Sequence, residues 1–148
     1  IILAALTRSF LIAIISIGVF SLIVEMPINS ILFIFIFGFL SAFILGSLGF
    51  ITGLWAEKFD HTATVTNFVI TPLSFLSGVF YSIDKLPNFF QTISYINPFF
   101  YMIDGFRYGF LGKSDSSISL GLIYLSILSI VMWYVAFFLY KKGYKIKS

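Results

Sequence analysis

The sequence contains apolar stretches long enough to cross a lipid bilayer. Residues 31–56 form the clearest one, because they include no Asp, Glu, Lys or Arg. A transmembrane helix needs about 20 mainly apolar residues to cross a hydrocarbon layer of about 30 Å. Across the chain 59% of residues are hydrophobic and only 10% are charged, which leaves too few polar side chains to cover a water-soluble domain. We therefore expect an all-α membrane protein.

Four segments are predicted to cross the membrane, at about residues 3–24, 31–56, 62–81 and 116–140. A further segment, about residues 86–111, is broken by Asn97-Pro98 and carries charged side chains. Each charge at the bilayer centre would cost at least ~2.5 kcal/mol. We expect this segment to form a re-entrant or interfacial helical hairpin before the last span. The predicted fold is a polytopic helix bundle in a single membrane domain, residues 1–148.

Lysines gather directly after the last predicted span, at positions 141, 142, 145 and 147. Because basic residues are enriched on the cytoplasmic side of membrane proteins, the C-terminus is predicted to be cytoplasmic. Four crossings place Arg8 and Lys58 on the same side as this cluster, whereas a fifth crossing would put Lys58 on the opposite side. The chain is thus predicted to be a multi-pass membrane protein.

Small residues recur along residues 31–56 at steps of three or four, which places them on one face of a helix. A face with few side-chain atoms lets another helix approach closely, and the last two have the GxxxG spacing. Packing within one subunit is the commoner use of such a seam, and dimerisation of two subunits is the alternative. The members of this predicted packing seam are Gly38, Ala42, Gly46, Gly49 and Gly53.

A short polar loop precedes the third predicted span and contains Glu57, Lys58 and Asp60. The loop either contacts an extramembrane partner through ion pairs or is a solvated turn between spans. Its neighbour His61 is the only histidine of the chain. A lone histidine lacks the companion ligands that a metal site needs, so no metal site is predicted.

The third predicted span, residues 62–81, is unusually polar for a helix in lipid. It contains hydroxyl and amide side chains, among them Asn67 and Thr71, around Pro72. Proline leaves a backbone carbonyl without its helical donor. The polar side chains either satisfy such groups or face a water-filled path through the bundle.

Asp104 and Arg107 lie three residues apart, so their side chains can pair on one helix. Pairing would lower the cost of partial burial, and a structural ion pair is favoured over substrate binding. Gly112-Lys113-Ser114 resembles the end of a phosphate-binding loop, but the first glycine of that motif would fall on Arg107. We therefore predict no catalytic residue and no bound cofactor for this chain. Because the basic residues gather at the C-terminal end, no nucleic-acid partner is predicted either.

The run TPLSFLSGVFYSIDKLPNFF, followed by NPFFYMIDGFRYGFLG, resembles the C-terminal signature of the type-2 ABC transporter permeases. It is close to the YadH-like branch of bacterial inner-membrane subunits. Gly78, Asp104, Gly105 and Arg107 occur in the order of that signature, and the similarity extends from about Ile1 to Lys147. The resemblance implies the C-terminal part of a permease of a bacterial inner (plasma) membrane, with the third to sixth spans.

The resemblance also implies partners: an ABC ATP-binding subunit, which would bind ATP and Mg, and a second permease subunit, most simply a second copy. The loop of Glu57, Lys58 and Asp60 would then face the ATPase. We further expect residues of the third span and of the aromatic-rich segment to form the translocation path or outer gate of an exporter. An interfacial aromatic belt is the alternative for the aromatic members. The expected path residues are Asn67, Thr71, Phe99, Phe100, Tyr101 and Phe106.

Two other functions compete with a transport subunit that has no ATPase site of its own. One is a membrane scaffold without transport activity. The other is a membrane-embedded enzyme acting on a lipid-linked substrate. The enzyme would need acid-base groups at the interface, and Asp84, Asp104 and Asp115 are the only candidates on the outer side.

Overall fold

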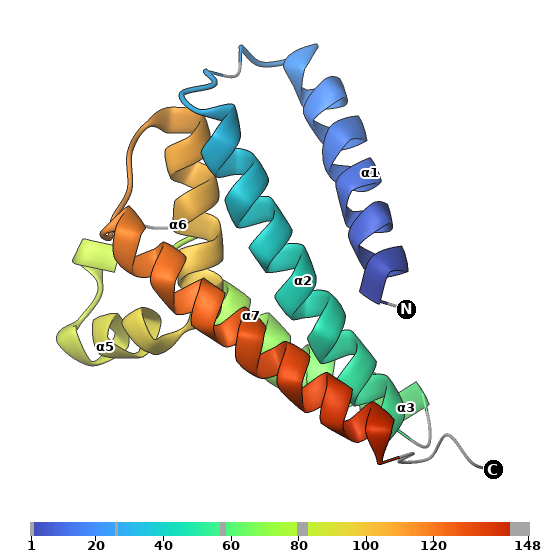
Figure 1. Ribbon diagram of the computed structural model, residues 1–148. Coiled ribbons are helices and arrows are strands. Elements are labelled where there is room, and N and C mark those ends of the chain that lie inside the picture. Colours follow the sequence, from blue (N-terminus) through green and yellow to red (C-terminus); the bar gives the residue numbers. More distant parts are fainter. Residues whose placement is uncertain (1, 26, 57–58, 80–82, 143–148) are drawn as a thin grey trace.

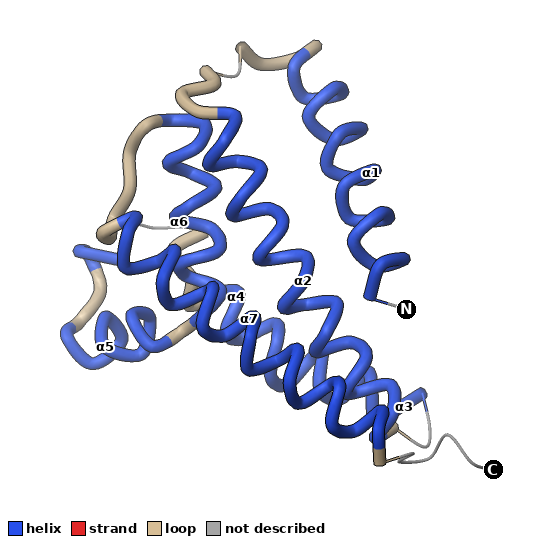
Figure 2. Tube along the Cα trace, viewed as in Figure 1, coloured by secondary structure: helices blue, strands red, loops and turns tan. Residues whose placement is uncertain are grey.

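The computed structural model describes residues 2–25, 27–56, 59–79 and 83–142, and these residues form helices and loops only (Figures 1 and 2). Three helices are long and apolar enough to cross a membrane: α1 (Ile2–Ser21), α2 (Ile31–Trp55) and α7 (Ile118–Lys141). They coincide closely with three of the four predicted spans. The all-α prediction is confirmed for the described residues.

The remaining predicted span, residues 62–81, is helical only as far as residue 75 and is divided into three parts. These are α3 (Phe59–Val65), the π-helical turn η1 (Thr66–Ile70) and α4 (Thr71–Phe75). The backbone keeps right-handed helical angles through both junctions. None of the three parts reaches the length of a span by itself, and Phe80, Tyr81 and Ser82 lie outside the described residues.

The π turn has a local cause in Pro72. A proline has no backbone N–H, and its ring clashes with the carbonyl four residues earlier in an α-helix. Directly before it, the Thr71 N–H donates to the Thr66 carbonyl, five residues back. The Thr71 hydroxyl donates to the same carbonyl at 3.0 Å. The wider turn thus accommodates the proline without ending the helix.

Helix α2 lies at the centre of the bundle and packs against α1, α6 and α7 (Figure 1). Its core-facing side chains include Phe37 and Ile44, which are almost fully buried. They join Phe100 of α6 and Leu125 of α7 in one hydrophobic cluster. Because α6 and α7 cover one side of α2 and α1 covers another, the central helix has two different environments.

The predicted hairpin is a pair of short helices, α5 (Asn88–Ile96) and α6 (Pro98–Leu111), preceded by the 3-10 turn η2 (Ile83–Lys85). The break falls at Asn97, as predicted, and the Asn97 side chain caps α6 by accepting from the Phe99 N–H at 3.0 Å. At ~1.5 Å per residue α6 is about 21 Å long, shorter than a hydrocarbon layer of about 30 Å. Helix α6 therefore does not span the membrane by itself.

Candidate functional site

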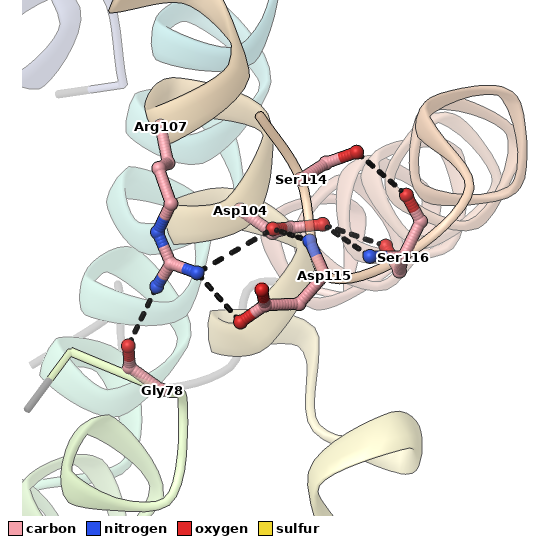
Figure 3. A network of polar contacts seen from close by, with 6 residues as sticks. All are labelled: Gly78, Asp104, Arg107, Ser114, Asp115 and Ser116. Carbon is pink, nitrogen blue, oxygen red and sulfur yellow. Dashed lines mark hydrogen bonds and ion pairs between the residues drawn. The ribbon is translucent and has the colours of Figure 1, made fainter. Parts of the chain in front are cut away.

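A network of charged and backbone groups joins α6 to the segments before α5 and after α6. The Arg107 guanidinium is its centre: one nitrogen contacts the Asp115 carboxylate at 2.6 Å, and the other donates to the Gly78 carbonyl at 2.6 Å (Figure 3). Asp104 lies farther away, at 3.9 Å. The predicted Asp104 and Arg107 pair is present, but Asp115 is the closer partner of the arginine. We call Gly78, Asp104, Arg107, Asp115 and Ser116 the polar clasp.

Asp104 is the buried anion of the clasp, with a side chain only 1% exposed. Its carboxylate accepts from the backbone N–H of Asp115 at 2.7 Å and from that of Ser116 at 3.0 Å. It also accepts from the Ser116 hydroxyl at 2.7 Å. A buried carboxylate is tolerated where several donors and a cation replace its water. Asp104 thereby fixes the loop that leads into α7.

The clasp also binds the end of the helical segment 59–75. Gly78 is buried and has φ 76°, a left-handed conformation that side chains disfavour. Two further carbonyls near this end accept hydrogen bonds from α5 and the following residue. The Ser94 hydroxyl donates to the Leu76 carbonyl at 2.8 Å, and the Asn97 amide donates to the Leu73 carbonyl at 2.6 Å. Carbonyls that a helix end leaves without donors are thus satisfied by the helix pair.

Two glycines let α6 lie directly against α2. A Cβ atom on Gly105 would overlap the Phe37 ring, and one on Gly109 would lie 2.5 Å from Ile34 Cγ1. Their four-residue spacing is that of a close helix contact. From the sequence, Gly105 was noted only as part of a family signature, and Gly109 was not predicted to have a role. The run GFRYG was the signal that could have identified this contact.

The aromatic residues predicted to form a gate lie in different environments. Phe100 and Tyr101 are buried in the core, where the Tyr101 hydroxyl donates to the Tyr95 carbonyl at 2.9 Å. Burial raises the pKa of the Tyr101 phenol, with the neighbouring tyrosines adding to the shift, so the hydroxyl remains a donor. Phe99 and Phe106 are half-buried. A role in gating stays a prediction for all four.

The polar residues of the third predicted span are not gathered into a shared site. Asn67 and Thr71 are both exposed, and Thr71 bonds to its own helix. Of the predicted partner-facing loop, Asp60 lies exposed in the first turn of α3. Glu57 and Lys58 lie outside the described residues.

The predicted packing seam is used along part of its length. A Cβ on Gly38 would lie 3.3 Å from Phe106, and one on Gly46 would lie 3.2 Å from the Ala5 methyl. Ala42 between them is buried. A Cβ on Gly49 or on Gly53 would have no neighbouring atom within 4 Å among the described residues. The seam therefore packs within this chain at its first three members.

The carboxylates of the clasp are engaged in structural contacts. Asp104 accepts from three donors and Asp115 from Arg107. Within the described ranges, no group of three or more His, Asp or Glu residues is placed to hold a metal ion. The arrangement favours mechanical linkage of helices over acid-base chemistry. Asp115 and Ser116 were not predicted as members, because their role depends on a loop that folds back onto α6.

Comparison with known proteins gives the family. The model of the ABC-2 type transporter family matches residues 1–111. The chain is 36% identical over 125 residues to the inner membrane transport permease YadH of Escherichia coli (strain K12), which covers 84% of this chain and 49% of that protein. It is 33% identical over 90 residues to Nodulation protein J of Rhizobium leguminosarum bv. viciae, covering 61% of this chain and 35% of that protein. No solved structure matches the chain.

The chain spans about half the length of YadH. The matched region includes α1 to α6, and with them Asp104, Arg107 and the glycine contacts on α2. These matches confirm the resemblance to type-2 ABC transporter permeases that the aromatic-rich segment indicated. This chain belongs to the ABC-2 type transporter family of membrane transport permeases.

Proposed function

We propose that the chain forms part of the permease of an ATP-driven exporter in a bacterial inner membrane, with its C-terminus cytoplasmic. A separate ATP-binding subunit hydrolyses ATP with its Mg, and a second permease subunit, most simply a second copy, completes the translocation path. Family membership supports this proposal, because ABC-2 permeases are membrane transport subunits. The lysines at the end of α7 support the orientation.

The polar clasp is the structural feature that best supports a mechanism of coupling between the ATPase and the permease helices. The segment 59–75 begins next to the loop proposed to face the ATPase and ends near Gly78, which Arg107 holds. Asp104 and Arg107 connect that end to α6 and to the loop before α7 (Figure 3). A displacement of α3 by the ATPase would therefore be transmitted to α6 and α7 together. The aromatic gate would open as these helices move.

The gate itself is best tested at Phe99 and Phe106. Both are half-buried, so truncation leaves a smaller cavity than truncation of the fully buried Phe100. Export reduced by Phe99→Ala or Phe106→Ala in stable protein would support the gate. Unchanged export by both would leave the interfacial belt as the explanation of these aromatics.

The membrane-embedded enzyme is the weaker alternative. Its candidate acids, Asp104 and Asp115, already accept hydrogen bonds or pair with Arg107. An acid held in this way is poorly placed to exchange protons with a substrate. Asp84, the third candidate, has no described side-chain environment.

The test is co-purification of the complete permease with candidate ATP-binding subunits, followed by ATP hydrolysis in lipid vesicles. We expect a stable complex whose ATPase rate changes in the presence of the permease. An Arg107→Gln variant should still bind the ATPase but lose the coupling between hydrolysis and export. Lys113→Gln, which removes the same charge from an exposed loop residue, serves as the control. Absence of any complex would contradict the transporter proposal.

A further inference from the structure

A groove runs between α1 and α2 on the side of α2 away from the core. One part is a cavity of about 430 Å³, the first cavity, which Phe10, Ile17, Phe35 and Phe106 help to line and which is within the size range of small-molecule sites. A second cavity of about 500 Å³ continues it along the same two helices, and Ser9, Ala42 and Leu45 border both. The two helices meet where the Phe10 and Phe35 rings stack at 5.3 Å and where Ala5 approaches Gly46.

The walls of this groove offer few groups for a polar ligand. The Ser9 hydroxyl donates to the Ala5 carbonyl at 2.8 Å, and the Ser41 hydroxyl donates to the Phe37 carbonyl at 2.6 Å. Both hydroxyls are therefore satisfied by their own helices. The surface that remains accepts a hydrocarbon chain.

Arg8 is the exception, because it lines the second cavity beside Ser9. Its side chain is exposed, and it makes no hydrogen bond or ion pair with any residue that the structure describes. Yet it lies within α1, a candidate membrane span. A cation in such a segment is costly without a partner, and an anion would satisfy it.

The distance along α1 from Arg8 to Ile17 is close to the hydrocarbon thickness of one leaflet. From Arg8 to Ile17 the helix rises about 13 Å at ~1.5 Å per residue, and half of a hydrocarbon layer is about 15 Å thick. A lipid phosphate at Arg8 would thus have its acyl chain along the first cavity. The end of α1 that carries Arg8 lies toward the same end of the molecule as the C-terminal end of α7 (Figure 1), where basic residues indicate the cytoplasmic side.

We propose that the α1–α2 groove binds an anionic phospholipid of the cytoplasmic leaflet. Arg8 binds the phosphate through charge-assisted hydrogen bonds, and the apolar walls bind one acyl chain. The lipid fills the space that α1 and α2 leave beside their contacts at Phe10 and Phe35 and at Ala5 and Gly46. Binding of this lipid requires neither a transport substrate nor the ATPase.

The experiment measures lipid binding to the complete, delipidated permease in detergent by native mass spectrometry. The probes are palmitoyl-oleoyl phosphatidylglycerol and the zwitterionic palmitoyl-oleoyl phosphatidylcholine. We expect the anionic lipid to bind more tightly. Arg8→Gln should weaken that preference on the order of tenfold, as loss of a charge-assisted hydrogen bond does, and Arg8→Lys should retain most of it. Lys113→Gln is the control for net charge.

A second variant tests the groove apart from the charge. Ala13→Leu places a larger side chain in the first cavity and should reduce binding of the acyl chain while Arg8 remains. Because Arg8 is exposed, Arg8→Gln is expected to fold even if the larger side chain is not accepted. Equal binding of both lipids, unaffected by Arg8→Gln, would overturn the proposal. So would a groove already filled by another part of the complete protein, seen as no bound lipid in wild type.

Discussion

Helix α2 has two contrasting neighbours, α6 on its core side and α1 on the other. Helix α6 has fourteen residues, six of which are buried. Helix α1 has twenty residues and buries only Leu6 among them. Glycines bring α6 into direct contact with α2, whereas α1 leaves an apolar groove beside it.

The difference shows which helices are held together by contacts within this chain. Around α6 the polar groups are paired within the chain, through Asp104, Arg107 and Asn97. Around α1 the apolar surface is left for lipid or for another protein segment. In a membrane, apolar surface can face lipid without cost, so tight contacts depend on close packing and on polar groups.

Substitutions in the clasp should destabilise the protein more than substitutions elsewhere. Arg107→Leu leaves the buried Asp104 and the Gly78 carbonyl without their cationic partner. We expect a loss on the order of 3 kcal/mol of stability, measured as a lower midpoint of thermal unfolding in detergent. Arg8→Leu removes an arginine outside the clasp and should change the midpoint far less. Equal losses for the two variants would remove the contrast between the two regions.

The glycine contacts give the next largest effect. Gly105→Ala adds a methyl group that overlaps the Phe37 ring, and such overpacking costs about 1–3 kcal/mol. Gly49→Ala adds the same group to α2, where no described atom lies within 4 Å, and should be neutral or slightly stabilising, because Ala favours a helix over Gly. The measurement is the unfolding midpoint of both variants. A greater loss from Gly49→Ala would indicate that another chain segment packs there.

Asn97 links the two short helices to the end of α4. Asn97→Ala removes the α6 cap and the donor to the Leu73 carbonyl, and we expect a loss of about 1–2 kcal/mol. Hydrogen exchange should increase in α5 and around Leu73 first. Asn88→Ala, at the exposed first residue of α5, is the matched control. Unchanged exchange in Asn97→Ala would show that this linkage contributes little.

The smallest effect is expected at Ser47. This residue is fully buried, and its hydroxyl has no hydrogen-bond partner among the described residues. Ser47→Ala should therefore be neutral or stabilising by up to about 1 kcal/mol. Ser94→Ala, which loses its bond to the Leu76 carbonyl, should instead destabilise by about that amount. A clear loss of stability in Ser47→Ala would mean that the hydroxyl has a partner in the complete protein.

Much of the helix pattern could be predicted from the sequence, because hydrophobic length is a local property. Residues 31–56 agree with α2 within one residue, and Asn97-Pro98 separates α5 from α6 as expected. The π turn before Pro72 was not predicted. Proline indicates that the helical bonding must change, but the choice between a kink and a wider turn depends on neighbouring contacts.

Only the part of the candidate site that lies within one helix could be predicted from the sequence. Asp104 and Arg107 are three residues apart, so their proximity follows from the helix. Asp115 and Gly78 lie 8 and 29 residues from Arg107, and only the folded loops bring them to it. The seam shows the same limit, since its spacing predicted a close helix contact but not that Gly38 meets Phe106 and Gly46 meets Ala5.

Apolar length and proline act locally, so the residues alone identify a helical membrane protein with a broken aromatic-rich segment. Which polar groups of that segment are paired, and with which partners, depends on how the chain folds. Burial makes an unpaired charge or carbonyl costly, so those partners are fixed by the arrangement of α4, α6 and the loop before α7. The same arrangement left Arg8 at an apolar groove with no protein partner among the described residues.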